Sequence, residues 1–543
     1  MTSSYSHHPA PILQAQLAAV TSVNAVLDNW AGRAGDRLAI DMPSIEGDRL
    51  RHTYGELRDI TLLMAAGLHA VGLRAGDRIA ILAEGGAYAQ CVVAYLALLR
   101  LGCIMVPVNP RFVDEEIEHA LTLTGCTGLF ASAAFAGRVD RMDVARSLRF
   151  RLGMRDAVAP AWIDWSALRQ AAPLPDVPDA TPTSPANIIF TSGTTGKPKG
   201  VLHTHGTALA CGAIYASAVT LGAGDVYHHP IPFCTSSGTQ FTLMAALWAG
   251  ATLVTEPEFK APDVLARMRA LGTTVFLGVP SHLLFLLDEL RRTGGVELPA
   301  LRVWNYGGAV MPREAIDTLR KAFPKVAQRQ NYGMTETGPT GTLLGPGDID
   351  ARPGSTGRPM PLCEVRILDE RGRVTTTGEG GEICVRSPAC MQGYYGNSVA
   401  TQETLEDGWV RTGDVGYLDA DGFLYYTDRR KDIINRGGLK VGSIEIEEVL
   451  YRSDQILEAA VIAVPHPRLG EDIAAFVVAR PGATIDRPAL DRLLQGALAS
   501  FKMPRSIHVL AALPRNAMGK VLKAELRQLV AGGTLRDDGA PAP

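Results

Sequence analysis

Residues 188–200 read IIFTSGTTGKPKG, an apolar run that passes into glycines, hydroxylated residues and lysines. Glycines let backbone N–H groups approach an anion closely, and hydroxyl groups add further donors. A turn between two strands often has such a composition, but two lysines beside three glycines favour a phosphate-binding loop. The residues predicted to bind phosphate are Thr191, Ser192, Gly193, Thr194, Thr195, Gly196, Lys197 and Lys199.

The spacing within this loop excludes a P-loop, which has four residues between its glycines and a Ser or Thr after its lysine. Here only two threonines separate Gly193 from Gly196, and Lys197 is followed by Pro198. The proline also disfavours a helix that starts directly after the lysine, because the residue before a proline is displaced from the α region. The loop is therefore expected to bind phosphate in another architecture.

Length and composition indicate a globular chain of several domains. The chain has 543 residues, of which 46% are hydrophobic and 20% charged, and this length suggests about three or four domains or subdomains. A net charge of −3 and the lack of a long basic run give no sign of a nucleic-acid partner. The eight cysteines form no C-x-x-C pair, which fits reduced thiols in a cytoplasmic protein. The longest apolar stretch, residues 87–108, is interrupted by Gln90, Arg100 and Pro107, so no transmembrane segment is predicted.

Alternating helix and strand patterns predict α/β layers over residues 50–131 and again over about 203–345. Short glycine-punctuated runs predict a small β-rich subdomain at about 355–427. A last α/β unit follows the charged string TDRRKD. The predicted fold is α/β, with a large N-terminal domain over residues 1–428, a small mobile α+β C-terminal domain over residues 431–543, and a hinge at about 429–431.

Other stretches carry candidate functional groups. In NYGMTETG, Thr335 can place a hydroxyl on a phosphate, and Glu336 can place a carboxylate on Mg²⁺, which prefers one or two carboxylates plus substrate phosphates. In RTGDVGYLDADG, Asp414 can bind both ribose hydroxyls. A basic, glycine-containing segment follows at 428–448, and Lys520 follows a glycine near the end of the chain. Taken singly, these features have commoner explanations: a helix cap, an Asx-turn, a solvated linker and a surface charge.

Together and in this order, the stretches resemble the acyl-CoA synthetases of the adenylate-forming superfamily. The resemblance runs from about residue 24 to about residue 530 and includes TSGTTGKPKG, YGMTETG, RTGDVGYLDADG, DRRKD, GEDIAAFVV and PRNAMGK. It implies a ligase in which a carboxylate attacks the α-phosphate of MgATP to give acyl-AMP and pyrophosphate, after which the thiol of CoA displaces AMP. ATP, Mg²⁺, CoA and a small carboxylic acid are the implied cofactors and partners.

The resemblance also implies roles in the first half-reaction. Lys520 would bridge the carboxylate and the α-phosphate, Thr335 would contact that phosphate, and Glu336 would hold Mg²⁺. The glycine-rich loop would clasp the leaving pyrophosphate. Asp414 would take the ribose hydroxyls with help from Arg429. Further nucleotide-binding positions would be Gly307, Gly308, Ala309, Asn331, Tyr332, Gly333 and Met334.

For the second half-reaction, the resemblance implies that the C-terminal domain rotates about Lys431, the hinge residue. Residues 434–441, among them Lys440, would then face the active site and line the path of the CoA thiol. In many relatives, a histidine or a neighbouring aromatic residue controls the entry of the CoA thiol into its tunnel. This chain reads PIPFCTSSG at that point, so this control is altered or Phe233 provides it. Cys234 is expected to be a packed thiol, because the chemistry needs no nucleophile from the protein.

The resemblance places the acyl pocket at neutral residues with no acidic group for an amino substituent, which disfavours amino acids and leaves fatty, alicyclic or aryl acids. These residues are Phe233, Cys234, Thr235, Ser236, Val279, Tyr306 and Met334. A stand-alone enzyme that loads a carrier protein, a luciferase-like oxygenase and a non-catalytic nucleotide-binding regulator are the alternatives. The oligomeric state is not readable from the sequence, and a homodimer stays open.

Overall fold

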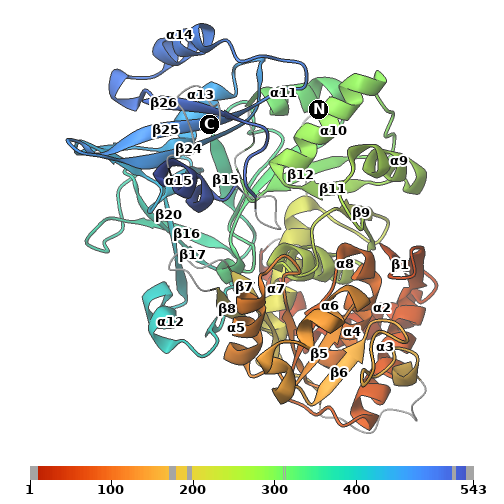
Figure 1. The fold of residues 1–543 in the computed structure, drawn as a ribbon. Coiled ribbons are helices and arrows are strands. Elements are labelled where there is room, and N and C mark those ends of the chain that lie inside the picture. Colours follow the sequence, from red (N-terminus) through yellow and green to blue (C-terminus); the bar gives the residue numbers. More distant parts are fainter. Residues whose placement is uncertain are drawn as a thin grey trace.

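The fold of the chain was taken from a computed structural model, which describes residues 10–169, 179–191, 198–309, 311, 313–515 and 521–532. It has a large N-terminal domain of α/β layers and a small C-terminal domain, which lies beside two helices of the large domain (Figure 1). The predicted boundaries of the two domains and the hinge between them stay predictions.

One sheet of the large domain has seven strands, and its phosphate-loop strands lie toward one edge. Five strands run parallel, and the last two pair antiparallel at this edge. In spatial order the strands are β18 (Gly393–Tyr394), β8 (Lys199–Thr204), β7 (Pro185–Thr191), β4 (Ile104–Pro107), β3 (Arg78–Leu82), β5 (Gly128–Ala131) and β6 (Phe150–Gly153).

The second sheet has fourteen strands, and its central part is parallel. Strand β11 (Val275–Gly278, VFLG) is a continuous apolar run, as is typical of a strand in a parallel sheet that is covered on both faces. The parallel strands are β13 (Ala327–Tyr332), β12 (Val303–Gly307), β11 (Val275–Gly278), β9 (Val226–His229), β10 (Thr252–Thr255) and β1 (Leu38–Pro43), with β2 (Arg49–Thr53) antiparallel beyond β1.

The predicted β-rich stretch forms strands that extend this same sheet. Strand β14 pairs with β13 on one side and with β15 on the other, which joins the antiparallel part to the parallel part. The antiparallel strands are β14 (Thr342–Leu344), β15 (Ser355–Pro359), β16 (Glu364–Leu368), β17 (Gly381–Arg386), β19 (Leu405–Glu406), β20 (Trp409–Leu418) and β21 (Leu424–Arg429).

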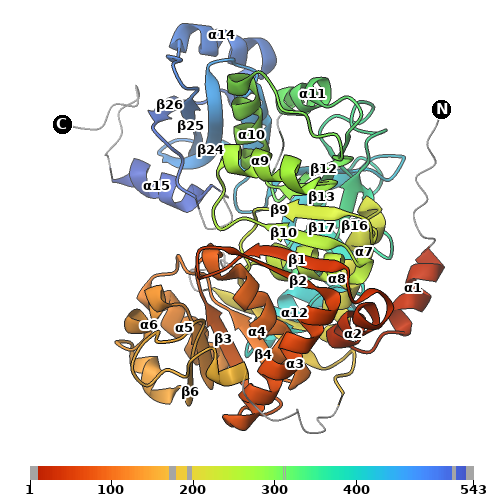
Figure 2. The ribbon, with the colours of Figure 1, turned by 90° about the vertical axis from the view of Figure 1, so that its right-hand side faces the viewer.

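Helices cover both sheets and bury the main core between them (Figure 2). Helix α4 is buried along almost its whole length, and a capping box of Thr53 and Glu56 lies at the start of α3. The helices of the large domain are α1 (Ala10–Ala18), α2 (Val23–Ala34), α3 (Tyr54–Ala70), α4 (Tyr88–Arg100), α5 (Asp114–Thr124), α6 (Ala133–Val139), α7 (His205–Val219), α8 (Met244–Ala249), α9 (Ala261–Leu271), α10 (Pro280–Thr293), α11 (Arg313–Ala322) and α12 (Ser398–Thr404).

The C-terminal domain has a five-stranded sheet with an apolar core on each face. The stretches LEAAVIAV and DIAAFVVA form its long central hairpin. Its elements are β22 (Ile434–Arg436), β23 (Leu439–Val441), α13 (Ser443–Leu450), β24 (Ile456–His466), β25 (Gly470–Ala479), α14 (Arg487–Ala497), β26 (Ser506–Leu510) and α15 (Lys523–Ala531).

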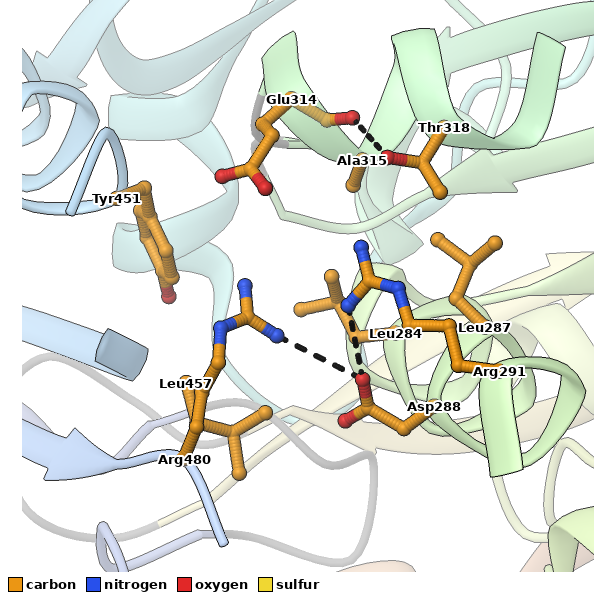
Figure 3. A pocket seen from close by; sticks show the side chains of 10 residues that line it. All are labelled: Leu284, Leu287, Asp288, Arg291, Glu314, Ala315, Thr318, Tyr451, Leu457 and Arg480. Atoms are coloured by element: carbon orange, nitrogen blue, oxygen red, sulfur yellow. Dashed lines mark hydrogen bonds and ion pairs between the residues drawn. The ribbon is translucent and has the colours of Figure 1, made fainter. Parts of the chain in front are cut away.

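The domains meet where the C-terminal domain contacts α10 and α11. A small pocket there is lined by side chains from both domains, and Arg480, just after β25, lies 3.6 Å from Asp288 of α10 (Figure 3). Arg291 pairs with the same carboxylate at 3.2 Å. Asp288 thus links the two domains by an ion pair.

Within the described ranges, no single helix has the length and apolar character needed to cross a membrane. Helices α1 and α2 meet that test only as a pair, and a bend of 96° separates them.

Candidate active site

The TET turn after β13 places Glu336 in a buried position. The residue is 5% exposed, and its Oε1 accepts a hydrogen bond of 2.8 Å from the hydroxyl of Tyr394 in β18. Burial raises the pKa of Glu336 above its usual range, although the Tyr394 hydrogen bond opposes this effect. No ion pair to this carboxylate is found among the described residues. Glu336 is therefore a buried carboxylate without an ion-pair partner in that part of the chain, although Arg429 and Lys199 act on its charge from a longer distance and lower its pKa.

Thr335, beside it, is held by two other segments. Its hydroxyl lies 2.9 Å from the Ser236 hydroxyl, and its carbonyl oxygen lies 3.0 Å from Nε2 of His203 in β8. Because a carbonyl oxygen only accepts, Nε2 must donate, and Nδ1 then accepts from the Thr207 hydroxyl at 3.2 Å. Burial lowers the pKa of His203 to about 4, so the ring is neutral at physiological pH.

The phosphate loop begins and ends close to this turn. Thr191 ends β7 and Lys199 begins β8, and these two residues pair across the hairpin. The Lys199 ammonium lies 4.8 Å from the centre of the Tyr394 ring, so that one tyrosine contacts both Lys199 and Glu336. The predicted phosphate contacts Ser192, Gly193, Thr194, Thr195, Gly196 and Lys197, as well as Lys520, lie outside the described residues.

A second buried carboxylate, Asp414, lies on β20. Its Oδ2 accepts a 2.8 Å hydrogen bond from the Tyr332 hydroxyl, and its Oδ1 lies 3.4 Å from Nε of Arg429. The register of the antiparallel strands β20 and β21 places Asp414 directly opposite Arg429. The structure thus brings together three residues that the sequence predicts at the nucleotide.

The carboxyl end of β12 offers a backbone surface beside Asn331. Gly307 pairs with Asn331 in β13, and a Cβ on Gly307 would come within 2.5 Å of the Asn331 side-chain nitrogen. Gly308 has a φ of 81°, a conformation that favours glycine. Gly308 and Ala309 are exposed at the end of the strand. Such an edge allows a flat ring to approach the backbone.

The predicted acyl-pocket segment contains a π-helix at Ser237–Leu243, which the sequence did not indicate. Phe233 is buried, with its ring 5.5 Å from that of Tyr88 and 6.1 Å from that of Tyr95. The Thr235 hydroxyl is satisfied locally, because it donates to the Pro232 carbonyl and accepts from Gly238 N. Burial raises the pKa of the Cys234 thiol to about 12, as suits a packed thiol.

Tyr306 differs from its prediction as a pocket wall. Its ring is fully buried in the core beneath α10 and α11, and its hydroxyl lies 3.4 Å from Gln328. Side chains alternate along a strand, so Tyr306 faces away from its neighbours Asn305 and Gly307. Only its backbone remains at the edge that carries Gly308. Val279 is buried at the start of α10, and Met334 is half-buried beside Thr335.

The predicted hinge lies at the end of β21, and the residues on either side of it contact the C-terminal domain through a hydrogen bond and an ion pair. The Asp428 carboxylate accepts from Ser443 N at the start of α13, and Asp432 pairs with Arg527 of α15. Lys431 itself is exposed. Lys440 pairs with Glu370 at 2.8 Å on the surface, and the structure does not show it in contact with Glu336 or Asp414.

Mg²⁺ fits this site as a partly protein-bound ion. No group of three or more His, Cys, Asp or Glu side chains suited to a metal is found within the described ranges. Mg²⁺ is commonly held by one or two carboxylates with substrate phosphates supplying other ligands, and Glu336 offers such a carboxylate.

Sequence reasoning missed Tyr394 and His203. Tyr394 is 58 residues from Glu336, and His203 is 132 residues from Thr335. The GYYG stretch around Tyr394 shows glycines that flank aromatics, but only the pairing of β18 with β8 brings this tyrosine to the site.

Comparisons with known proteins agree with this geometry. The family described as AMP-binding enzyme matches residues 27–395, and the AMP-binding enzyme C-terminal domain matches residues 445–520. An indoleacetate–CoA ligase from Aromatoleum aromaticum is 34% identical over 94% of this chain and 98% of its own length. A Mycobacterium tuberculosis CoA ligase named for a propanoyl group on a methyl-dioxo-octahydro-indene ring is 35% identical over 94% and 99%.

Two further similar proteins bear on the acceptor and on the fold. A fatty acid–acyl-carrier-protein ligase from Streptomyces coeruleorubidus is 34% identical over 89% of this chain and 92% of its own length. The solved o-succinylbenzoate CoA synthetase of Bacillus subtilis, in complex with its acyl-adenylate, has a TM-score of 0.80 and 30% identity, covering 92% of this chain and 97% of its own. The chain belongs to the AMP-binding enzyme family and is an adenylate-forming, ATP-dependent acyl-CoA synthetase.

Proposed function

We propose that this ligase activates aryl or alicyclic carboxylic acids, with Glu336, Thr335, Asp414, Arg429, Lys199 and Lys520 as its principal polar groups. The observation that carries the proposal is that two buried carboxylates, Lys199 and Arg429 come from four separate strands and turns, and that Arg429 and Lys199 both lower the pKa of Glu336. The predicted acyl-pocket residues are neutral, and the names of two similar ligases refer to ring-bearing acids.

Adenylation brings a carboxylate toward the polyanionic phosphates of ATP. One pair of like charges 4 Å apart repels by roughly 4 kcal/mol at an effective dielectric constant of 20, so the site must supply cations. Lys199 and the predicted residues Lys197 and Lys520 supply positive charge from the chain. The Thr335 hydroxyl donates to the α-phosphate, and its contact with Ser236 fixes its direction.

Glu336 would hold Mg²⁺ together with the phosphates, and the bound ion would supply charge neutralisation for the departing pyrophosphate. The Glu336 carboxylate is suited to this task because it is buried and has no ion-pair partner among the described residues. Lys199 is half-buried, and its ammonium group lies over the Tyr394 ring. It therefore supplies a further positive charge to the phosphates.

Asp414 accepts hydrogen bonds from the ribose hydroxyls, and Arg429 pairs with the buried carboxylate at 3.4 Å. The adenine ring lies against the backbone of residues 307–309, where Gly308 is exposed and has no side chain. Asn331, Tyr332, Gly333 and Met334 complete the wall between this edge and Thr335. These contacts persist after pyrophosphate leaves, because AMP remains part of the acyl-adenylate.

The second half-reaction uses a rotation of the C-terminal domain about Lys431. This motion removes Lys520 and turns residues 434–441, with Lys440, toward the acyl-adenylate. The exposed position of Lys431 and the surface pairing of Lys440 with Glu370 are compatible with a segment that changes partners.

The experiment that tests the substrate class is a panel of acids matched in carbon number. Arylacetic acids, alicyclic propanoic acids and linear fatty acids are compared by CoA-dependent AMP release at limiting concentration. We expect higher kcat/KM values for the ring-bearing acids. A preference for the linear acids at every chain length would contradict the proposal.

Transfer to a carrier protein is the second candidate, because one similar protein is named as an acyl-carrier-protein ligase. The same panel is run with free CoA and with a pantetheine-loaded carrier protein. We expect thioester on CoA, and product on the carrier protein alone would favour the second candidate. A cytoplasmic location and a homodimer stay predictions.

A further inference from the structure

Tyr394 connects the two charged parts of the phosphate site, although it is neutral itself. Its hydroxyl donates to Glu336 Oε1 at 2.8 Å, and the Lys199 ammonium lies over its ring at 4.8 Å. Tyr394 is 8% exposed and Glu336 is 5% exposed, so the contact is shielded from water. A shielded hydrogen bond to a charged group is stronger than one between neutral groups.

The backbone fixes Tyr394 in this place. Strand β18 pairs Tyr394 with Val201 of β8, and Tyr394 N donates to the Thr401 hydroxyl at 2.9 Å. Met391 N donates to the carbonyl oxygen of Glu336 at 2.8 Å. The 391–394 segment therefore holds both the backbone and the carboxylate of Glu336, and the phenol cannot move away independently.

A neutral donor has a different effect on this carboxylate from a cationic one. An arginine or lysine would orient Glu336 but would also cancel its charge and repel an arriving cation. The phenol restricts one oxygen and leaves the net negative charge in place. Within the described residues, Oε2 has no hydrogen-bond partner, so it stays open to a cation.

We propose that Tyr394 is a positioning residue that presents Glu336 to the divalent cation accompanying ATP. The proposal rests on the proposed metal role of Glu336 and adds the residue that orients it. Hydrogen-bond partners of a metal ligand typically change metal affinity by about 10–100-fold when they are removed. Tyr394 is therefore expected to set the Mg²⁺ requirement of adenylation more than its maximal rate.

The variant that tests this is Tyr394→Phe, which removes only the hydroxyl and keeps the ring beneath Lys199. The matched control is Tyr395→Phe, since the neighbouring Tyr395 hydroxyl has no hydrogen bond within the described ranges. Each purified protein is titrated with Mg²⁺ in carboxylate-dependent ATP–pyrophosphate exchange. Mn²⁺ binding is measured separately by electron paramagnetic resonance with α,β-methylene-ATP, which does not react.

For Tyr394→Phe we expect the Mg²⁺ half-saturation and the Mn²⁺ dissociation constant to rise by about 10-fold. The exchange rate at saturating Mg²⁺ should stay within about threefold, because the metal ligand itself remains. Tyr395→Phe should match the unaltered protein. A merely structural role of Tyr394 would instead lower the maximal rate or the melting temperature at unchanged Mg²⁺ half-saturation, and that result would overturn the proposal.

Glu336→Gln separates this proposal from the one on which it rests. If Glu336→Gln weakens Mn²⁺ binding and Tyr394→Phe does not, the positioning role fails and the metal role stands. If neither substitution weakens it, the metal role itself fails. In the double variant, Tyr394→Phe should add no further loss, because no charged carboxylate is left to orient.

Glu336→Asp gives a second test that leaves Tyr394 intact, should the phenylalanine variant not fold. Shortening the side chain withdraws the carboxylate from the phenol. We expect a comparable rise in Mg²⁺ half-saturation, and an unchanged value would overturn the proposal.

Discussion

Glu336 and Asp414 are two buried carboxylates that each accept a 2.8 Å hydrogen bond from a tyrosine hydroxyl, but their charged neighbours differ. Asp414 has the Arg429 guanidinium at 3.4 Å, whereas Glu336 has no ion pair among the described residues. A carboxylate in a direct ion pair suits neutral hydroxyl groups, and one that lacks such a pair suits a metal ion. The difference teaches that similar side-chain contacts support a ribose site in one place and a cation site in the other.

The largest effect is expected from Glu336→Gln, which removes the charge and keeps the shape. Adenylation should slow by about 10²-fold or more, because charge stabilisation at a reacting phosphate is lost. Carboxylate-dependent ATP–pyrophosphate exchange measures this step. An activity within a few-fold of the unaltered protein would show that the Glu336 charge is not used for a cation.

A smaller effect is expected from Asp414→Asn. The loss of a charged acceptor for the ribose hydroxyls should raise the KM for ATP by about 10–100-fold, in line with 1.5–3 kcal/mol for such hydrogen bonds. The Mg²⁺ half-saturation should not change. If Asp414→Asn altered the Mg²⁺ requirement as strongly as Glu336→Gln, the assignment of separate roles to the two carboxylates would be wrong.

The sequence predicted the two carboxylates, Arg429 and most strands, because local motifs and hydrophobic patterns carry that information. It could not predict that β14 joins the antiparallel strands to the parallel sheet. This junction depends on the pairing of β14 with β13 and β15, which no local pattern encodes. Tyr394, and the contact of the predicted residue Tyr332 with Asp414, were missed for the same reason. Tyr332 lies 82 residues from Asp414 and Tyr394 lies 58 residues from Glu336, so each pair depends on tertiary packing.

A substitution at the hinge is expected to slow the second half-reaction and spare the first, which is the opposite of the effect expected for Glu336→Gln. Proline at position 431 fixes φ near −65°, and a hinge must change its backbone angles. For Lys431→Pro we expect thioester formation to fall by about tenfold or more, while pyrophosphate exchange stays within about threefold. Each half-reaction is measured separately. A loss in both steps alike would indicate damage to the fold in place of a blocked rotation.

The smallest effect is expected at the domain interface. Arg480→Ala removes the ion pair with Asp288, and such partly exposed pairs contribute about 0–1 kcal/mol (Figure 3). The ratio of the two half-reaction rates should shift by less than about fivefold. Arg487→Ala is a control within the C-terminal domain, because its partner Asp491 lies on the same helix. Equal shifts in both variants would argue against a specific interdomain effect.

The most direct measurement supplies synthetic acyl-AMP and CoA to Glu336→Gln and Asp414→Asn and records thioester formation. This step still uses the ribose site but no longer involves pyrophosphate or its cation. We expect Glu336→Gln to retain the rate within about threefold and Asp414→Asn to lose about tenfold in kcat/KM. Equal losses in the two variants, or a greater loss in Glu336→Gln, would contradict the assignment of one carboxylate to the metal and the other to the ribose.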